Sequence, residues 1–122
     1  MRIGLDEARA YWSHPSQHDY GHDESVLNDN LVYYANDGVC LAFEGVLVPG
    51  FVAVHIGAKP EAWGRTEQPV RALLHEFWGE YQPRYITAWI EDHKRHAVAL
   101  ARRVGFERLG EMPGVLMFGW RP

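Results

Sequence analysis

The feature that most restricts the fold is a run of three short β-type segments separated by tight turns. Aromatic and β-branched residues fill 31–35 and 39–48, and NDG at 36–38 between them is a hairpin signal because its residues tolerate positive φ. PG at 49–50 supplies a second turn before the segment 51–57, FVAVHIG. Tight turns join antiparallel strands, so we expect a three-stranded antiparallel meander.

The next region has the apolar spacing of a helix instead. Its apolar side chains recur at i, i+3, i+4, i+7 and i+8, which places them in one stripe. They are Val70, Leu73, Leu74, Phe77 and Trp78. We expect this helix to begin near Thr66 or Glu67, because Pro69 is tolerated only in a first turn.

The rest of the chain alternates strands and helices. RYITAWIE at 84–91 predicts a strand, followed by a helix that Asp92 can cap and that Gly105 ends as a C′ residue. The tail, with VLMFGW at 115–120, predicts one or two final strands, and LDEARAYW at 5–12 predicts a short first helix.

This order predicts an α+β fold, with a mixed β-sheet flanked by helices on both faces. The meander forms the N-terminal part of the sheet, and a β-α-β-α-β unit forms the rest. The sequence contains no repeat, low-complexity tract or linker, so we expect one domain over residues 1–122.

Composition narrows the function classes. A formal charge of −4 argues against a general nucleic-acid binder, which needs a basic face for phosphates. The single cysteine, Cys40, excludes an intramolecular disulfide and fits a reducing compartment. No apolar run is long enough to span a bilayer, and the N-terminus lacks the apolar core of a signal peptide. We therefore expect a cytoplasmic protein, either a monomer or a homodimer, that binds neither nucleic acid nor membrane.

The helix before Gly105 carries a recognisable motif. Ala97, Leu100 and the pair Gly105-Phe106 resemble the Asn-x-x-Ala-x-x-Leu-Tyr-x-x-x-Gly-Phe signature of the GNAT superfamily of N-acetyltransferases. The PEAWGR and LARRVGF segments resemble short acetyltransferase-like proteins of phage genomes. The resemblance implies splayed fourth and fifth strands, with acetyl-CoA as cosubstrate between them and an amine as acceptor. For a phage protein it would imply the host cytoplasm or the virion.

The resemblance also implies which residues bind acetyl-CoA. Val54 and Ile56 belong to the segment that would be the fourth strand, beside the thioester. Gly64, Arg65 and Thr66 fall in the loop that would hold the pyrophosphate, where backbone N–H groups and a helix dipole attract phosphate. The family's asparagine position is occupied by Lys94, which we assign to the same cofactor.

Three positions depart from the family pattern. Glu61 replaces a basic or amide residue in the loop, Lys94 replaces the asparagine, and Ala101 replaces a tyrosine that protonates the leaving thiolate in many members. Ala101 has no proton to donate. These departures favour an alternative hypothesis, a catalytically degenerate accessory or virion-associated phage protein of the same fold.

Two side chains are candidates for the base that deprotonates the acceptor amine. His55 lies within the 51–57 segment, where alternation puts Phe51, Ala53 and His55 on one face and Val54 and Ile56 on the other. Glu44 lies near the end of the preceding strand. The competing structural interpretations are a hydrogen-bonded buried histidine and a solvated turn carboxylate.

The N-terminal loop and the aromatic residues remain. His14, His18 and His22 are spaced by four, but Pro15 and Gly21 disfavour the helix that would gather them, so we assign no metal site. A histidine-loop metal binder stays a third hypothesis.

Most of the aromatic residues are expected in the core, and Trp63 is expected in a loop. The set of which most members are expected in the core is Phe77, Trp78, Tyr81, Trp89 and Trp120.

Overall fold

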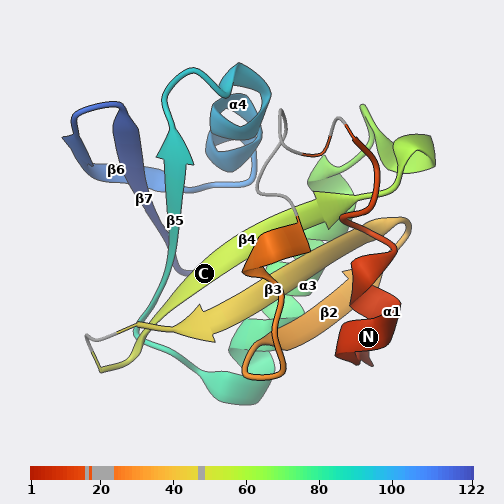
Figure 1. The fold of residues 1–122 in the computed structure, drawn as a ribbon. Helices are drawn as coiled ribbons and strands as arrows, with labels where there is room; N and C mark the ends of the chain where they lie inside the picture. The colour runs from red at the N-terminus through yellow and green to blue at the C-terminus, as the bar shows by residue number, and fades with distance from the viewer. Residues whose placement is uncertain (16, 18–23, 47–48) are drawn as a thin grey trace.

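The computed structural model describes residues 1–15, 17, 24–46 and 49–122 (Figure 1). Seven strands form one mixed sheet in the order β1-β2-β3-β4-β5-β7-β6. The strands are β1 Arg2–Ile3, β2 Val32–Asn36, β3 Val39–Gly45, β4 Phe51–Ala58, β5 Tyr85–Glu91, β6 Glu107–Met112 and β7 Val115–Trp120. The helices are α1 Leu5–Arg9, α3 Glu67–Tyr81 and α4 Arg95–Arg103, with short 3₁₀ turns η1 Glu24–Val26 and η2 Pro60–Ala62.

Strands β1 to β4 form the predicted antiparallel half. Asp37 and Gly38, with φ of 47° and 82°, make the turn between β2 and β3, which confirms the hairpin. The second strand was predicted to run to residue 48 but ends at Gly45, and residues 47–48 lie outside the described residues. Strand β1 was not predicted, since two residues give no pattern.

The other half contains β5, β7 and β6. Strand β5 runs parallel to β4 and antiparallel to β7, and β6 and β7 form a hairpin. The parallel pairing requires a crossover between β4 and β5, and α3 provides it. The predicted mixed α+β sheet is therefore confirmed.

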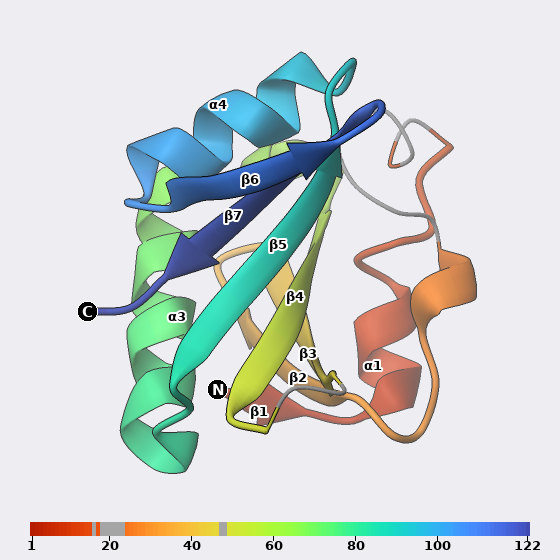
Figure 2. The same cartoon turned by 90° about the vertical axis from the view of Figure 1, so that its left-hand side faces the viewer.

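Helices α3 and α4 lie on one side of the sheet and α1 lies on the other (Figure 2). The predicted start of α3 is correct, because Thr66 is its N-cap residue. Gly105 follows α4 with a φ of 102°, as predicted for a C′ glycine. Asp92 does not cap α4: the N-cap residue is Lys94, and Asp92 belongs to a preceding turn. Helix α1 ends at Arg9, three residues earlier than predicted.

The core is divided by the sheet. The larger cluster lies under α3 and α4 and includes Leu41, Phe43, Leu73, Leu74 and Phe118. The smaller cluster lies between α1 and the sheet. It consists of Ala8, Trp12, Leu31, Tyr33, Ala35, Cys40 and Ala42. We call the side of β2, β3 and β4 that this cluster occupies the covered face.

On the same side of the sheet, the part formed by β5, β7 and β6 exposes large apolar side chains. Trp89, Leu109 and Met112 are 49%, 47% and 44% exposed there. Met117 pairs with Trp89, and Met112 pairs with Val115, so these side chains share one side of the sheet. We call this side the open face.

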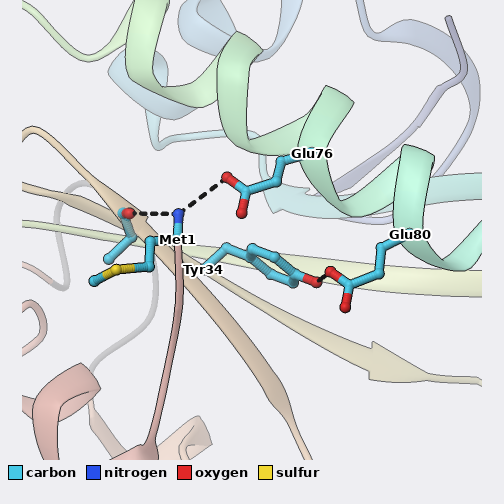
Figure 3. A network of polar contacts seen from close by, with 5 residues as sticks. Met1, Tyr34, Glu76 and Glu80 are labelled. Carbon is cyan, nitrogen blue, oxygen red and sulfur yellow. Dashed lines mark hydrogen bonds and ion pairs between the residues drawn. The ribbon is translucent and has the colours of Figure 1, made fainter.

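Polar contacts tie the sheet edge to α3 (Figure 3). The Met1 amine donates to the Ala35 carbonyl at 3.1 Å and to Glu76 Oε1 at 3.0 Å, and the buried Tyr34 hydroxyl donates to Glu80. Burial, together with the Glu80 carboxylate, raises the pKa of Tyr34. These contacts fix α3 against β1 and β2. None of the described helices is both long and apolar enough to cross a bilayer.

Candidate active-site cleft

A cleft opens where β4 and β5 separate. Their parallel pairing covers only Phe51–Ala53 and Tyr85–Thr87, and beyond these pairs the strands diverge (Figure 1). The cleft holds about 690 Å³ of space, part of which is open to solvent. The backbone edges of β4 and β5 that face the cleft no longer pair with each other.

The helices make the interior of the cleft apolar. Val70 and Leu74 come from α3, and Ala97, Leu100 and Ala101 come from α4. These residues form the cleft wall because their buried stripes face the sheet at the point where the strands part. The cleft can therefore accept a narrow, largely apolar chain.

The polar lining residues lie at the lip of the cleft. They are His55 from β4, Glu91 at the end of β5, and Lys94 at the start of α4, with Trp89 beside them. The Glu91 carboxylate lies 3.3 Å from His93 Nε2, and both side chains are largely exposed. An apolar cleft with a few convergent polar groups is the usual architecture of a ligand site.

His55 and Glu44 form a pair at this lip. The register of β3 and β4 sets Ala42 opposite His55 and Ala53 opposite Glu44, so the two side chains are diagonal neighbours on one side of the sheet. Glu44 Oε1 lies 2.6 Å from His55 Nε2. The His55 side chain is only 14% exposed and that of Glu44 is 40% exposed. A carboxylate this close orients the imidazole ring.

The structure places the other predicted residues of β4 as expected from alternation. Val54 and Ile56 pack against the larger core cluster and line the cleft, while His55 shares its side with Ala53. Lys94 lines the cleft at the first turn of α4. Ala101 lines it deeper and is buried, so the position matched to the family tyrosine offers no hydroxyl.

The predicted phosphate loop lies outside the described lining of the cleft, just before α3. Gly64 is exposed and has a φ of 81°, a conformation that suits glycine. The Arg65 guanidinium donates to the carbonyl oxygen of Glu61. Thr66 is buried at the N-cap position of α3. The loop is thus held by its own contacts, beside the positive end of the α3 dipole.

Two aromatic residues expected in the core are exposed. Trp89 is 49% exposed and Tyr81 is 43% exposed, so these two do not belong to the core, whereas Phe77 and Trp120 are buried and Trp78 packs against it. Strand alternation could have corrected the first, because Ile86, Ala88 and Ile90 occupy the buried side of β5 and leave Trp89 on the other. Trp89 and Glu91 line the cleft and were not predicted as site residues.

The N-terminal histidines are only partly described. The His14 ring meets the Trp63 ring edge-on at a centroid distance of 4.8 Å, next to the predicted phosphate loop. His18 and His22 lie outside the described residues. Within the described part of the chain, no three metal-ligating side chains lie close enough to hold an ion.

Comparison of the sequence found no matching family model and no matching curated protein. Comparison of the structure found acetyltransferases. The N-acetyltransferase PseH of Campylobacter jejuni, solved with acetyl coenzyme A, matches with a TM-score of 0.65 and 12% identity over 77% of this chain and 70% of that one. The ribosomal-protein-S5-alanine acetyltransferase of Vibrio fischeri matches with a TM-score of 0.66 and 12% identity, over 100% of this chain and 94% of that one.

A GNAT-family acetyltransferase from Bacillus anthracis also matches, with a TM-score of 0.57 and 12% identity. The match covers 67% of this chain, which spans a little over half (57%) of the Bacillus protein's length. At these identities the likeness concerns the fold. The chain therefore has the fold of the GNAT acetyltransferases.

Proposed function

We propose that this chain is an N-acetyltransferase that transfers an acetyl group from acetyl-CoA to an amine. The observation that carries the proposal is the apolar cleft between β4 and β5 with the His55–Glu44 pair at its lip. The fold supports it, since one structural neighbour was solved with acetyl coenzyme A.

The residues around the cleft fit the parts of acetyl-CoA. Its pantetheine arm is narrow and extended, which suits a slot between two strands whose facing edges are unpaired. Val54 and Ile56 would contact this arm from β4. Gly64, Arg65 and Thr66 would receive the pyrophosphate at the N-terminus of α3, because Gly64 allows close approach and the helix dipole favours anions. Lys94 would add positive charge from α4.

The chemistry assigned to the chain is a proton transfer at the lip of the cleft. His55 accepts a proton from the attacking amine, directly or through water, while Glu44 holds the ring in position. The amine nitrogen forms a bond to the thioester carbonyl carbon, and the C–S bond then breaks. The products are the amide and a CoA thiolate, which takes up one proton.

A second candidate is a protein of this fold that binds a partner without turnover, as an accessory or virion-associated protein. The observation that favours it is Ala101, which is buried in the cleft wall and cannot protonate a thiolate. Glu61 adds a carboxylate beside the predicted phosphate loop. Under this hypothesis the cleft retains its shape but has no acetyl-CoA function.

The two candidates differ in a binding measurement. Thermal unfolding with millimolar acetyl-CoA, and with CoA and ATP as controls, should show a rise in Tm for both CoA ligands. A ligand at a hundredfold excess over its Kd stabilises the folded state by about 2.7 kcal/mol. Gly64→Glu should remove the rise, because it adds charge and strains a residue with positive φ. If Tm of the unaltered protein does not rise with acetyl-CoA or CoA, the result supports the non-catalytic candidate instead.

Turnover tests the role of His55. Replacing it by glutamine should lower kcat by roughly 10²–10⁴-fold, the usual contribution of a positioned base. Glu44→Gln should give a smaller loss, because it keeps a polar partner for the ring but removes the charge. Both variants should keep the Tm shift with CoA. An unchanged kcat in His55→Gln would exclude His55 as the base.

A further inference from the structure

A buried side chain from the N-terminal segment bonds to the backbone of β4. Gln17 is 1% exposed, and its carboxamide contacts two backbone groups of this strand. Gln17 Nε2 donates to the Ile56 carbonyl oxygen at 2.8 Å, and Gln17 Oε1 accepts from the Ala58 N–H at 3.3 Å. Both the donor and the acceptor of the amide are therefore used on β4.

Alternation shows which edge of β4 these two backbone groups belong to. Backbone groups of successive strand residues point to opposite edges. At the start of β4, the Phe51 carbonyl accepts from the N–H of Val46, the residue that follows β3. Odd-numbered residues of β4 thus point to β3, and Ile56 and Ala58 point the other way. Gln17 bonds to the edge of β4 that faces the cleft.

Gln17 takes the place that a residue of β5 would have in a continued ladder. In a parallel pair, a residue donates to the carbonyl before its partner and accepts from the N–H after it. Gln17 makes this pattern around Gly57. Ala53 pairs with Thr87, and in the same register Gly57 would face Glu91. The two strands have separated before that point, so the Gln17 side chain supplies the bonds that β5 does not.

A second contact from the same segment reaches the same residue of β4. A Cβ at Gly57 would lie 2.5 Å from the Trp12 ring, so the ring covers this glycine closely. The Gln17 N–H donates to the His14 carbonyl at 3.0 Å, in a turn that follows Trp12. Trp12 therefore holds Gly57 from the face of the sheet, while Gln17 holds its neighbours from the edge.

The stretch of β4 between the two fixed points is the part that lines the cleft. Residues 54–56 line it and are partly exposed, whereas Ala53 before them and residues 57–58 after them are buried. Within the described part of the chain, no strand pairs with this stretch on its cleft side. Between the last pair with β5 and the bonds to Gln17, the edge presents the Val54 carbonyl and the Ile56 N–H.

We propose that Gln17 is a positioning residue for the ligand of the cleft: its carboxamide closes the edge of β4 at Gly57 and leaves the ligand one acceptor, the Val54 carbonyl, and one donor, the Ile56 N–H. The inference rests on the proposed binding of acetyl-CoA, whose pantetheine arm carries amide groups that can pair with both. Because Gln17 fixes the far end of the edge, these two groups are in place before the ligand arrives, which lowers the ordering cost of binding.

The test compares the affinity of the folded chain for CoA with its stability. Gln17→Met keeps the length of the side chain but removes both bonds to β4. The Kd of CoA, measured by calorimetry, should rise roughly three- to tenfold, which corresponds to about one hydrogen bond. The variant should also unfold at a lower urea concentration, because two buried backbone groups lose their partners.

Thr87→Val is the matched control for a general loss of stability. The Thr87 hydroxyl donates to the Val52 carbonyl at 3.3 Å, and this residue is 6% exposed. The bond also joins a side chain to β4, but it lies where β4 and β5 are still paired. Thr87→Val should therefore unfold at a lower urea concentration and keep the original Kd for CoA.

A second measurement needs no variant. The side-chain amide of Gln17 gives its own signals in a nitrogen-15 NMR spectrum, and a bonded amide differs in chemical shift from one in water. Saturation with CoA should leave these signals at their bonded positions, because the ligand occupies the edge beside Gln17 and does not replace it.

The outcomes separate this inference from the proposed function. An unchanged Kd in Gln17→Met would mean that Gln17 supports only the fold, and a lower Kd would mean that it competes with the ligand. An equal rise in Thr87→Val, or release of the Gln17 amide when CoA binds, would also overturn the inference. In each case CoA still binds and the proposed function stands. If CoA does not bind to the unaltered chain, the proposed function fails and the inference fails with it.

Discussion

The covered face and the open face are two parts of one side of the sheet, yet they are built differently. On the covered face, Trp12 and Tyr33 are both 2% exposed, and Trp12 lies against Gly57 of β4. On the open face, Trp89 and Leu109 are about half exposed. The boundary between them is the cleft. The chain uses its N-terminal segment to stabilise one half and leaves the other half accessible beside the site.

The largest expected contrast is between two tryptophans. Trp12→Ala removes a buried ring from the covered face and should lower the free energy of unfolding by about 3–5 kcal/mol. The matched change Trp89→Ala on the open face should cost about 0.5 kcal/mol or less. Urea denaturation of both variants measures the difference. Similar losses in the two variants would show that Trp89 supports the fold after all.

A smaller contrast comes from two strand glycines. A Cβ at Gly57 would lie 2.5 Å from the Trp12 ring, so Gly57→Val should destabilise the chain by about 1–3 kcal/mol through overpacking. Gly110→Val on β6 is the control, because a Cβ at Gly110 would meet no neighbouring side chain or strand within 4 Å. It should leave stability nearly unchanged. A tolerated Gly57→Val would mean that the contact with Trp12 is loose.

The smallest expected effect concerns pH and the buried Cys40. Burial raises the pKa of the Cys40 thiol from 9.0 to about 12. Above pH 9 the unfolded chain loses this proton while the folded chain keeps it, so the free energy of unfolding falls between pH 9 and 12. The slope is at most about 1.4 kcal/mol per pH unit.

Urea titrations of the original chain and of Cys40→Ala at pH 8 and 10 measure this slope. The original chain should lose more stability than the variant between the two pH values. The same thiol should react with iodoacetamide more than about tenfold faster in urea than in the folded protein. Rapid labelling of the folded chain would show that the covered face opens easily.

Much of the fold followed from local patterns, whereas the arrangement of the site did not. The hairpin at Asp37-Gly38, the start of α3 and the end of α4 at Gly105 are set by turn chemistry and by periodicity, which are local. The prediction that Asp92 caps α4 failed, because residue type alone cannot show where the first helical hydrogen bond forms.

The pairing of Glu44 with His55 depends on the register between two strands. Strand register depends on turn geometry as well as on the hydrophobic pattern, and the sequence does not reveal that geometry. The sequence therefore offered two separate candidate bases where the structure has one pair. The exposure of Trp89 depends on which neighbouring elements cover β5, so it also needed the assembled sheet.

Because β4 and β5 share only three residue pairs, the backbone amides of β4 should exchange with water at different rates. Along β4 beyond Ala53, the amides that point to β3 sit in an intact ladder. The amides on the other edge have no strand partner, although that of Ala58 donates to the Gln17 side chain. One strand therefore carries two populations of backbone proton, slow and fast to exchange with water. A ligand that lies in the cleft and bonds to this edge would slow the exchange of the fast population. Hydrogen exchange of β4 would therefore report whether the cleft is occupied.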